Sequence, residues 1–338
     1  MAKEDDTKNR DQGILTRLRR NKWWRRLTGT ALILVVVAGL LIVFASNRFF
    51  YMSHQRFSDW SNIQWKYQSD SNVDPSRPWI IGHRGSGVKS TDSEADVDNK
   101  LIGNTISAIK AAIDEKVDWI EIDIRKSKDN KLVVFHDSNV AAKTSFDFDE
   151  SRRSDLTGEV PNLTLDELKG LTLNVESNEK ILTLDEVFAS SEIPSSEIQW
   201  IFDIKASGMK EQVSDWLTKN NIPIDQLILF GDYEVLEEFK GSDYPMGYTT
   251  LWAKSRKEML FNPSEMFDRC DELECEIMVV PIIFVTRTLV ESASKRGIEV
   301  WCYDSNDIRD LKYATGCGVK GVIGDYPEKM MNAFRDLE

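Results

Sequence analysis

A regular alternation of short apolar runs and helix-compatible stretches constrains the fold of this 338-residue chain more than any other feature. Eight runs have the composition of β-strands, and each neighbouring pair is separated by at least one helical pattern. Eight βα units in about 260 residues is the size expected of an α/β TIM (β/α)8 barrel, whose active site lies at the carboxyl ends of the strands. The predicted strands are Trp79–Gly82, Trp119–Ile124, Gln199–Ile204, Leu227–Phe230, Met246–Thr249, Glu276–Val280, Glu299–Tyr303 and Gly321–Gly324.

An uncharged stretch of 21 residues, Leu27–Asn47, precedes these strands. A helix of this length, at about 1.5 Å per residue, spans the hydrocarbon core of a bilayer, so we expect a single transmembrane helix. The first 26 residues carry nine Lys or Arg against four acids. This bias predicts a cytoplasmic amino terminus and an extracytoplasmic barrel, periplasmic or extracellular, at the cell membrane. Two alternatives are a buried core helix and a cleaved signal peptide.

These features predict four regions: a basic cytoplasmic tail (1–26), a transmembrane helix (27–47), a polar tether (48–77) and a barrel domain (78–338). The formal net charge of −13 argues against a nucleic-acid partner, because such partners attract basic surfaces. A hydrophobic content of 41% without a repeat period is ordinary for a folded globular chain. The oligomeric state is left open.

An additional strand-like run, 131–136, follows the second predicted strand too closely for a parallel crossover, so it predicts an antiparallel hairpin. A two-residue turn at 129–130 would place Asp123 directly opposite His136. Glu121 lies on the same face of its strand, by the period of two. We therefore expect two carboxylates and a histidine to share one small volume.

Other local signals concern structure rather than chemistry. The segments Thr164–Glu167 and Thr183–Glu186 have the capping-box pattern, which predicts that a helix begins at each. The four cysteines lack the spacing of a metal site. A disulfide between Cys270 and Cys275 is one option for an exported domain.

Several short motifs occur in a fixed order along the predicted barrel domain. They are His83-Arg84-Gly85, Gly103-Asn104-Thr105, Glu121-Ile122-Asp123, His136-Asp137, Asp203 with Lys205, Trp301, and the run Gly321–Pro327. This ordered set resembles the glycerophosphodiester phosphodiesterase family from about Pro78 to the carboxyl terminus. The resemblance implies a TIM barrel that hydrolyses a phosphodiester with a divalent cation, usually Ca²⁺ or Mg²⁺.

Phosphodiester hydrolysis needs charge neutralisation on the non-bridging oxygens, a base for the attacking oxygen and an acid for the departing alkoxide. Glu121, Asp123 and Asp203 supply hard oxygen ligands that suit Ca²⁺ or Mg²⁺, which makes them the candidate metal ligands. His83 and His136 then remain as the candidate acid/base pair.

Three further residues are candidates for substrate binding. Arg84 and Lys205 add positive charge, and the Arg84 guanidinium suits two phosphate oxygens. Trp301 is a candidate wall of the substrate site, with a core position as the alternative.

Some positions depart from the family pattern. Gly103 stands where the family has a glutamate, Asp203 replaces a longer acid, and Asp304 replaces an asparagine. An acid of the loop 87–102 would be one substitute for the missing glutamate, and a solvated insertion is the alternative reading of that loop.

The leading functional hypothesis is a membrane-anchored, metal-dependent enzyme that hydrolyses glycerophosphodiesters to glycerol 3-phosphate and an alcohol. The alternative enzyme is a lysophospholipase D or sphingomyelinase D-like phospholipase, which would act on a lysophospholipid or a related lipid. A catalytically degenerate binding module, suggested by Gly103, is a third hypothesis of a different class.

Overall fold

A computed structural model describes residues 77–88, 101–140, 158–173, 179–250, 263–303 and 305–335. The expected basic tail, the expected membrane helix and the tether up to residue 76 lie outside these ranges. Within the described ranges, every helix is too short or too polar to span a bilayer.

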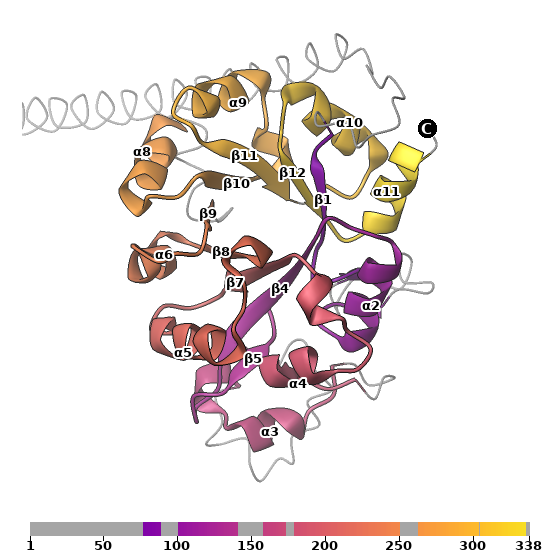
Figure 1. The fold of residues 1–338 in the computed structure, drawn as a ribbon, viewed down its shortest axis with the longest axis vertical. Helices are drawn as coiled ribbons and strands as arrows, with labels where there is room; N and C mark the ends of the chain where they lie inside the picture. Colours follow the sequence, from indigo (N-terminus) through magenta and orange to yellow (C-terminus); the bar gives the residue numbers. More distant parts are fainter. Residues whose placement is uncertain are drawn as a thin grey trace, which may run out of the picture. The chain divides into compact units, whose positions relative to one another are not determined.

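Eight parallel strands close into a barrel, as the alternation predicts (Figure 1). The order around the barrel is β1, β12, β11, β10, β9, β8, β7 and β4, and pairing between β1 and β4 closes it. The strands are β1 (Trp79–Gly82), β4 (Trp119–Lys126), β7 (Trp200–Ile204), β8 (Leu227–Gly231), β9 (Met246–Thr249), β10 (Ile277–Pro281), β11 (Glu299–Tyr303) and β12 (Gly321–Gly324).

The strands form where the apolar runs predict them, because a barrel strand is covered on both faces. Every residue of β8 and of β10 is buried, for example. Inward-pointing side chains fill the barrel as a packed core. This interior cluster comprises Ile81, Ile201, Ile228, Phe230, Ile277, Val279, Trp301 and Ile323.

Helices surround the strands (Figure 1). They are α2 (Ile106–Asp114), α3 (Leu165–Lys169), α4 (Leu184–Ala189), α5 (Lys210–Asn220), α6 (Tyr233–Phe239), α8 (Pro263–Leu273), α9 (Arg287–Ser294), α10 (Ile308–Cys317) and α11 (Pro327–Arg335). Short 3₁₀ turns are Val160–Asn162, Ser195–Glu197, Ile224–Gln226 and Ile282–Phe284. Both predicted capping boxes are confirmed: Thr164 with Glu167 begins α3, and Thr183 with Glu186 begins α4.

The predicted hairpin is confirmed, but its register is not. Strand β5 (Leu132–Val134) runs antiparallel to β4, and β6 (Leu182–Thr183) extends this excursion beyond the barrel. Ile124 pairs with Val134, and the Phe135 amide donates to the Asp123 carbonyl at 3.0 Å. Asp123 therefore faces Phe135 rather than His136.

The turn geometry explains this one-residue shift. The loop contains three residues, 128–130, and the Ser127 amide donates to the Lys131 carbonyl at 2.9 Å. Asn130 adopts a left-handed conformation with φ of 59°, which asparagine tolerates. A three-residue loop moves every downstream pairing by one position relative to the two-residue turn.

The loop after β1 contains a second, small parallel sheet, formed by β2 (Gly87–Val88) and β3 (Leu101–Ile102). The acids of this loop that the sequence suggests as substitutes for the family glutamate lie outside the described residues.

Farther along the chain, Cys270 and Cys275 are buried free thiols rather than the disulfide that the sequence leaves open.

Candidate active site

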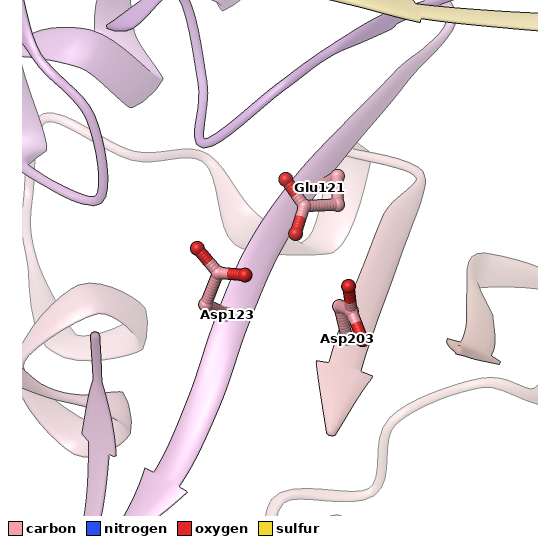
Figure 2. Close-up of side chains that lie close together, drawn as sticks. All are labelled: Glu121, Asp123 and Asp203. Atoms are coloured by element: carbon pink, nitrogen blue, oxygen red, sulfur yellow. The ribbon is translucent and has the colours of Figure 1, made fainter. Parts of the chain in front are cut away.

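Three carboxylates from two neighbouring strands meet near the carboxyl end of the barrel (Figure 2). Glu121 and Asp123 alternate along β4, and the register pairs Asp123 with Asp203 of β7. One oxygen from each of Glu121, Asp123 and Asp203 lies within 4.8 Å of the others. The three acids that the sequence selects as metal ligands are thus brought together by the parallel register.

Asp123 is the fully buried member of this group. Its Oδ2 accepts a hydrogen bond from Asn104 Nδ2 at 2.7 Å and lies 3.1 Å from Arg84 Nε. Its Oδ1 forms an ion pair with Lys205 Nζ at 2.9 Å. Burial alone would raise the pKa of Asp123, but Lys205 and Arg84 outweigh it and hold the pKa well below its ordinary value. Asp123 is therefore ionised.

Glu121 is also buried, with one carboxylate oxygen occupied and one unpartnered. Its Oε2 accepts the Arg84 backbone N–H at 2.8 Å and lies 4.0 Å from His83 Nε2. Its Oε1 is buried and has no hydrogen-bond partner among the described residues. Burial and the charge of Asp123 raise the pKa of Glu121 well above its ordinary value. Because an unpartnered buried carboxylate oxygen is costly, this donor set fits a hard divalent cation.

His83, the residue directly after β1, is held by a carboxylate from the other end of the chain. Its Nδ1 lies 2.5 Å from Asp325 Oδ1. Asn306 fixes Asp325 at two points: its side-chain amide donates to Oδ2 at 3.0 Å, and its Oδ1 accepts the Asp325 backbone N–H at 2.8 Å. Burial opposes ionisation of Asp325, but His83 and Asn306 lower its pKa to about 2. The contact with Asp325 at Nδ1 turns Nε2 of the ring toward Glu121.

His136 lies just beyond β5, in the excursion from β4. Its Nδ1 is 3.0 Å from Asp137 Oδ1, and its side chain is about one-third exposed, at 36%. Burial lowers the pKa of His136 below its ordinary value of 6.5, although Asp137 opposes this. The ring is therefore neutral near pH 7.

Lys205 lies immediately after β7, between two of the acids. It pairs with Asp123 and with Asp203. Burial alone would lower the pKa of Lys205, but these carboxylates raise it well above its ordinary value. The ammonium is therefore charged near neutral pH.

Gly103 explains the path of Arg84. Arg84 has a left-handed backbone with φ of 57°, and its side chain is buried. A Cβ on Gly103 would lie 2.8 Å from Arg84 Cβ and 3.1 Å from Arg84 Cδ. The absence of a side chain at 103 thus leaves space for the arginine to pass toward Asp123.

Trp301 requires a correction. Its side chain is fully buried in the barrel core and packs against Trp79 and Trp119, with ring centroids 5.4 Å and 6.5 Å away. Trp79 and Trp119 begin β1 and β4, so this aromatic cluster lies toward the amino ends of the strands, opposite the carboxyl ends. Trp301 is therefore a core residue, not a wall of the substrate site.

Sequence reasoning missed several residues that orient the site. Asp325, Asp137 and Asn104 lie inside the motifs that it uses, but it assigns them no role. Their positions next to candidate groups were the available signal. For Asp325 and Asn104, the contacts that give them a role join residues far apart in the sequence, which no local pattern contains. Asp137 contacts its own chain neighbour, His136.

Comparison with known proteins agrees with this geometry. The family model described as "Glycerophosphoryl diester phosphodiesterase family" matches residues 83–329. The chain belongs to this family. Its match begins at His83 and includes every candidate catalytic and metal-binding residue described above.

Two curated members of the family illustrate its range. The glycerophosphodiester phosphodiesterase of Caldanaerobacter subterraneus subsp. tengcongensis is 24% identical over 274 residues, covering 76% of this chain and 97% of that protein. Lysophospholipase D GDPD1 of Homo sapiens is 23% identical over 286 residues, covering 76% of this chain and 86% of that protein. The enzyme class, glycerophosphodiester phosphodiesterase, is thereby established, whereas the preferred substrate is not.

A solved structure shows the shared fold. An Oleispira antarctica phosphodiesterase, determined in complex with the product sn-glycerol-3-phosphate, superposes with a TM-score of 0.59 at 22% identity. The match covers 77% of this chain and 97% of that one. The family-model match, residues 83–329, does not include the expected membrane segment.

Proposed function

We propose that this enzyme hydrolyses glycerophosphodiesters to glycerol 3-phosphate and an alcohol, with a divalent cation and two histidines. The observation that carries the proposal is the convergence of Glu121, Asp123 and Asp203 beside His83 and the cations Arg84 and Lys205. The Oleispira antarctica structure, which holds sn-glycerol-3-phosphate, supports the same product class.

Glu121, Asp123 and Asp203 are the residues that would hold Ca²⁺ or Mg²⁺. Both ions prefer carboxylate oxygens, and the unpartnered Glu121 Oε1 is available for one. When bound, such an ion neutralises charge on the phosphate oxygens. Arg84 and Lys205 add charge to the same region, and the Arg84 guanidinium suits two phosphate oxygens.

The two histidines have different surroundings, which suggests different tasks. The neutral ring of His136 suits the base that accepts a proton from the attacking oxygen. His83 would act as the acid in its doubly protonated form: Nδ1–H donates to Asp325, and the proton on Nε2 is the one that would pass to the departing alkoxide. The attacking oxygen belongs either to water or to the neighbouring glycerol hydroxyl, by way of a cyclic phosphate.

The direct test is turnover of glycerophosphocholine by the full-length chain, followed by enzymatic detection of glycerol 3-phosphate. We expect His136→Ala to lower kcat by about a hundredfold or more without changing the circular dichroism spectrum, which is the usual scale for a general acid/base. His54→Ala, in the remaining histidine of the chain, is the matched control.

Excess chelator should abolish activity, and Ca²⁺ or Mg²⁺ should restore it. Activity that persists in chelator would refute the metal dependence.

A lysophospholipase D activity is the second candidate, favoured by the human relative of that name and by the expected membrane anchor. Parallel assays with glycerophosphocholine and lysophosphatidylcholine separate the two candidates. Strict preference for the acylated substrate would replace the first proposal with the second. Binding of Ca²⁺ without turnover of either substrate would instead favour the degenerate binding module.

We also propose that residues 27–47 anchor the chain to the cell membrane, with the barrel on the extracytoplasmic side. The support is the uncharged 21-residue stretch and the basic cluster before it. Protease treatment of intact cells, or of spheroplasts where the cell has an outer membrane, should degrade the barrel while leaving cytoplasmic proteins whole. A barrel that is protected until the cytoplasmic membrane itself is permeabilised would overturn this topology.

A further inference from the structure

We propose that Arg125 is a positioning residue, whose guanidinium holds the main chains of His136 and Lys205 in fixed relation to each other. The catalytic consequence of this proposal rests on the function proposed above. No motif used in the sequence analysis includes Arg125, and the proposal comes from its contacts alone.

Arg125 lies at the point where β4 has separated from β7 but still pairs with β5. It pairs with Val133 of β5 on one side, whereas on the other side the register with β7 ends one residue earlier, at Ile124 and Ile204. By the period of two, its side chain points to the same face as those of Glu121 and Asp123. Arg125 is thus the next inward-facing residue of β4 toward the carboxyl end of the barrel.

The guanidinium bridges the two segments that carry His136 and Lys205. Its Nε donates to the His136 carbonyl at 2.8 Å, and its Nη1 donates to the Lys205 carbonyl at 3.3 Å. Lys205 directly follows Ile204, the last residue of β7, and His136 lies two residues beyond Val134, the last residue of β5. Among the described residues, no backbone amide donates to either carbonyl.

This arrangement needs the fork of an arginine rather than positive charge alone. The guanidinium presents several N–H donors in one rigid plane, so it can reach two carbonyls on opposite sides of β4. A lysine ammonium carries the same charge on a flexible stem. Small displacements of catalytic groups reduce rates strongly: about 1 Å can lower them a hundredfold. A change at Arg125 is therefore expected to affect kcat more than KM.

The experiment compares Arg125→Lys, Arg125→Met and a matched control, Lys126→Met, in the full-length chain. Lys126 is the next residue of β4 and also donates to a backbone carbonyl, Gly208, at 2.6 Å, but at an exposed site. We expect both Arg125 variants to lose about ten- to hundredfold in kcat for glycerophosphocholine, with KM within about threefold of wild type. The control should keep wild-type kcat and KM.

A second measurement does not depend on turnover. The chain has three histidines, so NMR of ring-¹⁵N-labelled histidine resolves them individually. The His136 signals should shift in both Arg125 variants, and the His83 signals should not. If wild type has no activity, the proposed function fails, and this spectrum still decides whether Arg125 fixes His136.

Three results would overturn the inference. Wild-type kcat in Arg125→Lys would show that charge alone suffices. A loss confined to KM would make Arg125 a substrate contact. Unchanged His136 signals in folded Arg125→Met, or in Arg125→Lys if the methionine variant does not fold, would exclude a positioning role.

Discussion

Gly103 shows how a single missing side chain bears on the chemistry. The glycine occupies the position of a family glutamate, and it accommodates the stem of Arg84 rather than leaving a gap. The structure thus gives this glycine a packing role beside Arg84, and the turnover assays proposed above decide between an active enzyme and a degenerate barrel.

Gly103→Ala tests this interpretation at the residue scale. A Cβ at this position would lie 2.8 Å from Arg84 Cβ, so the arginine stem has to move away from Asp123. We expect KM for glycerophosphocholine to rise by about tenfold, because a phosphate contact is misplaced. Gly170→Ala, at the glycine that ends α3 with an ordinary φ of −64°, is the control for chain stability. Unchanged kinetic constants for Gly103→Ala would contradict the argument.

Asp325 gives a pH-dependent prediction. Its pKa is about 2 in the folded protein, below its ordinary value of 3.8, so its ionised form stabilises the folded state. This stabilisation, about 2 kcal/mol, is fully present above pH ~4 and is lost as the pH falls toward 2. Asp325→Asn should therefore lower the free energy of unfolding at pH 7, and this difference should shrink below pH 4. Urea denaturation at several pH values measures both, and a pH-independent difference would contradict the assignment.

At the scale of elements, the loop between β4 and β5 decides where His136 lies. Three loop residues and the left-handed Asn130 set a register in which Phe135, not His136, faces Asp123. Because side chains alternate along a strand, one residue more or less in the loop reverses the face of every residue in β5.

Deletion of Asp129 would impose the shorter loop. We expect kcat to fall by about a hundredfold or more, because β5 either shifts by one residue or loses its pairing with β4. Asn130→Gly keeps the required positive φ and should retain kcat within about twofold. Steady-state kinetics of the two variants tests the claim, and a fully active deletion variant would show that the loop does not set the register.

At the scale of the whole molecule, cation binding should contribute to stability. A ligand that binds only the folded state adds RT ln(1 + [L]/Kd), about 2.7 kcal/mol at a hundredfold excess over Kd. Ca²⁺ or Mg²⁺ should therefore raise the Tm of the full-length chain by several degrees.

The size of this shift should depend on pH and on Glu121. Burial and Asp123 raise the pKa of Glu121, so protons compete with the cation as the pH falls. We expect a smaller Tm shift at pH 5 than at pH 8, and little shift in Glu121→Gln at either pH. Differential scanning calorimetry provides the comparison. An equal shift in Glu121→Gln would remove this residue from the ligand set.

Local sequence patterns determined the elements of this protein. The alternation of apolar runs predicts the eight barrel strands, the Thr-x-x-Glu patterns predict the starts of α3 and α4, and the short spacing predicts the β4–β5 hairpin. These features depend on residues close together in the chain, where backbone periodicity and capping are strong signals.

The tertiary structure alone decided the rest. The depth of Trp301 depends on how far along a strand the packed core extends, and the pairing of His83 with Asp325 joins residues 242 positions apart. The bridge from Arg125 depends on a loop conformation that fixes where β5 ends relative to β7. Each of these follows from distances between segments, and those distances are set only when the barrel closes and its side chains pack.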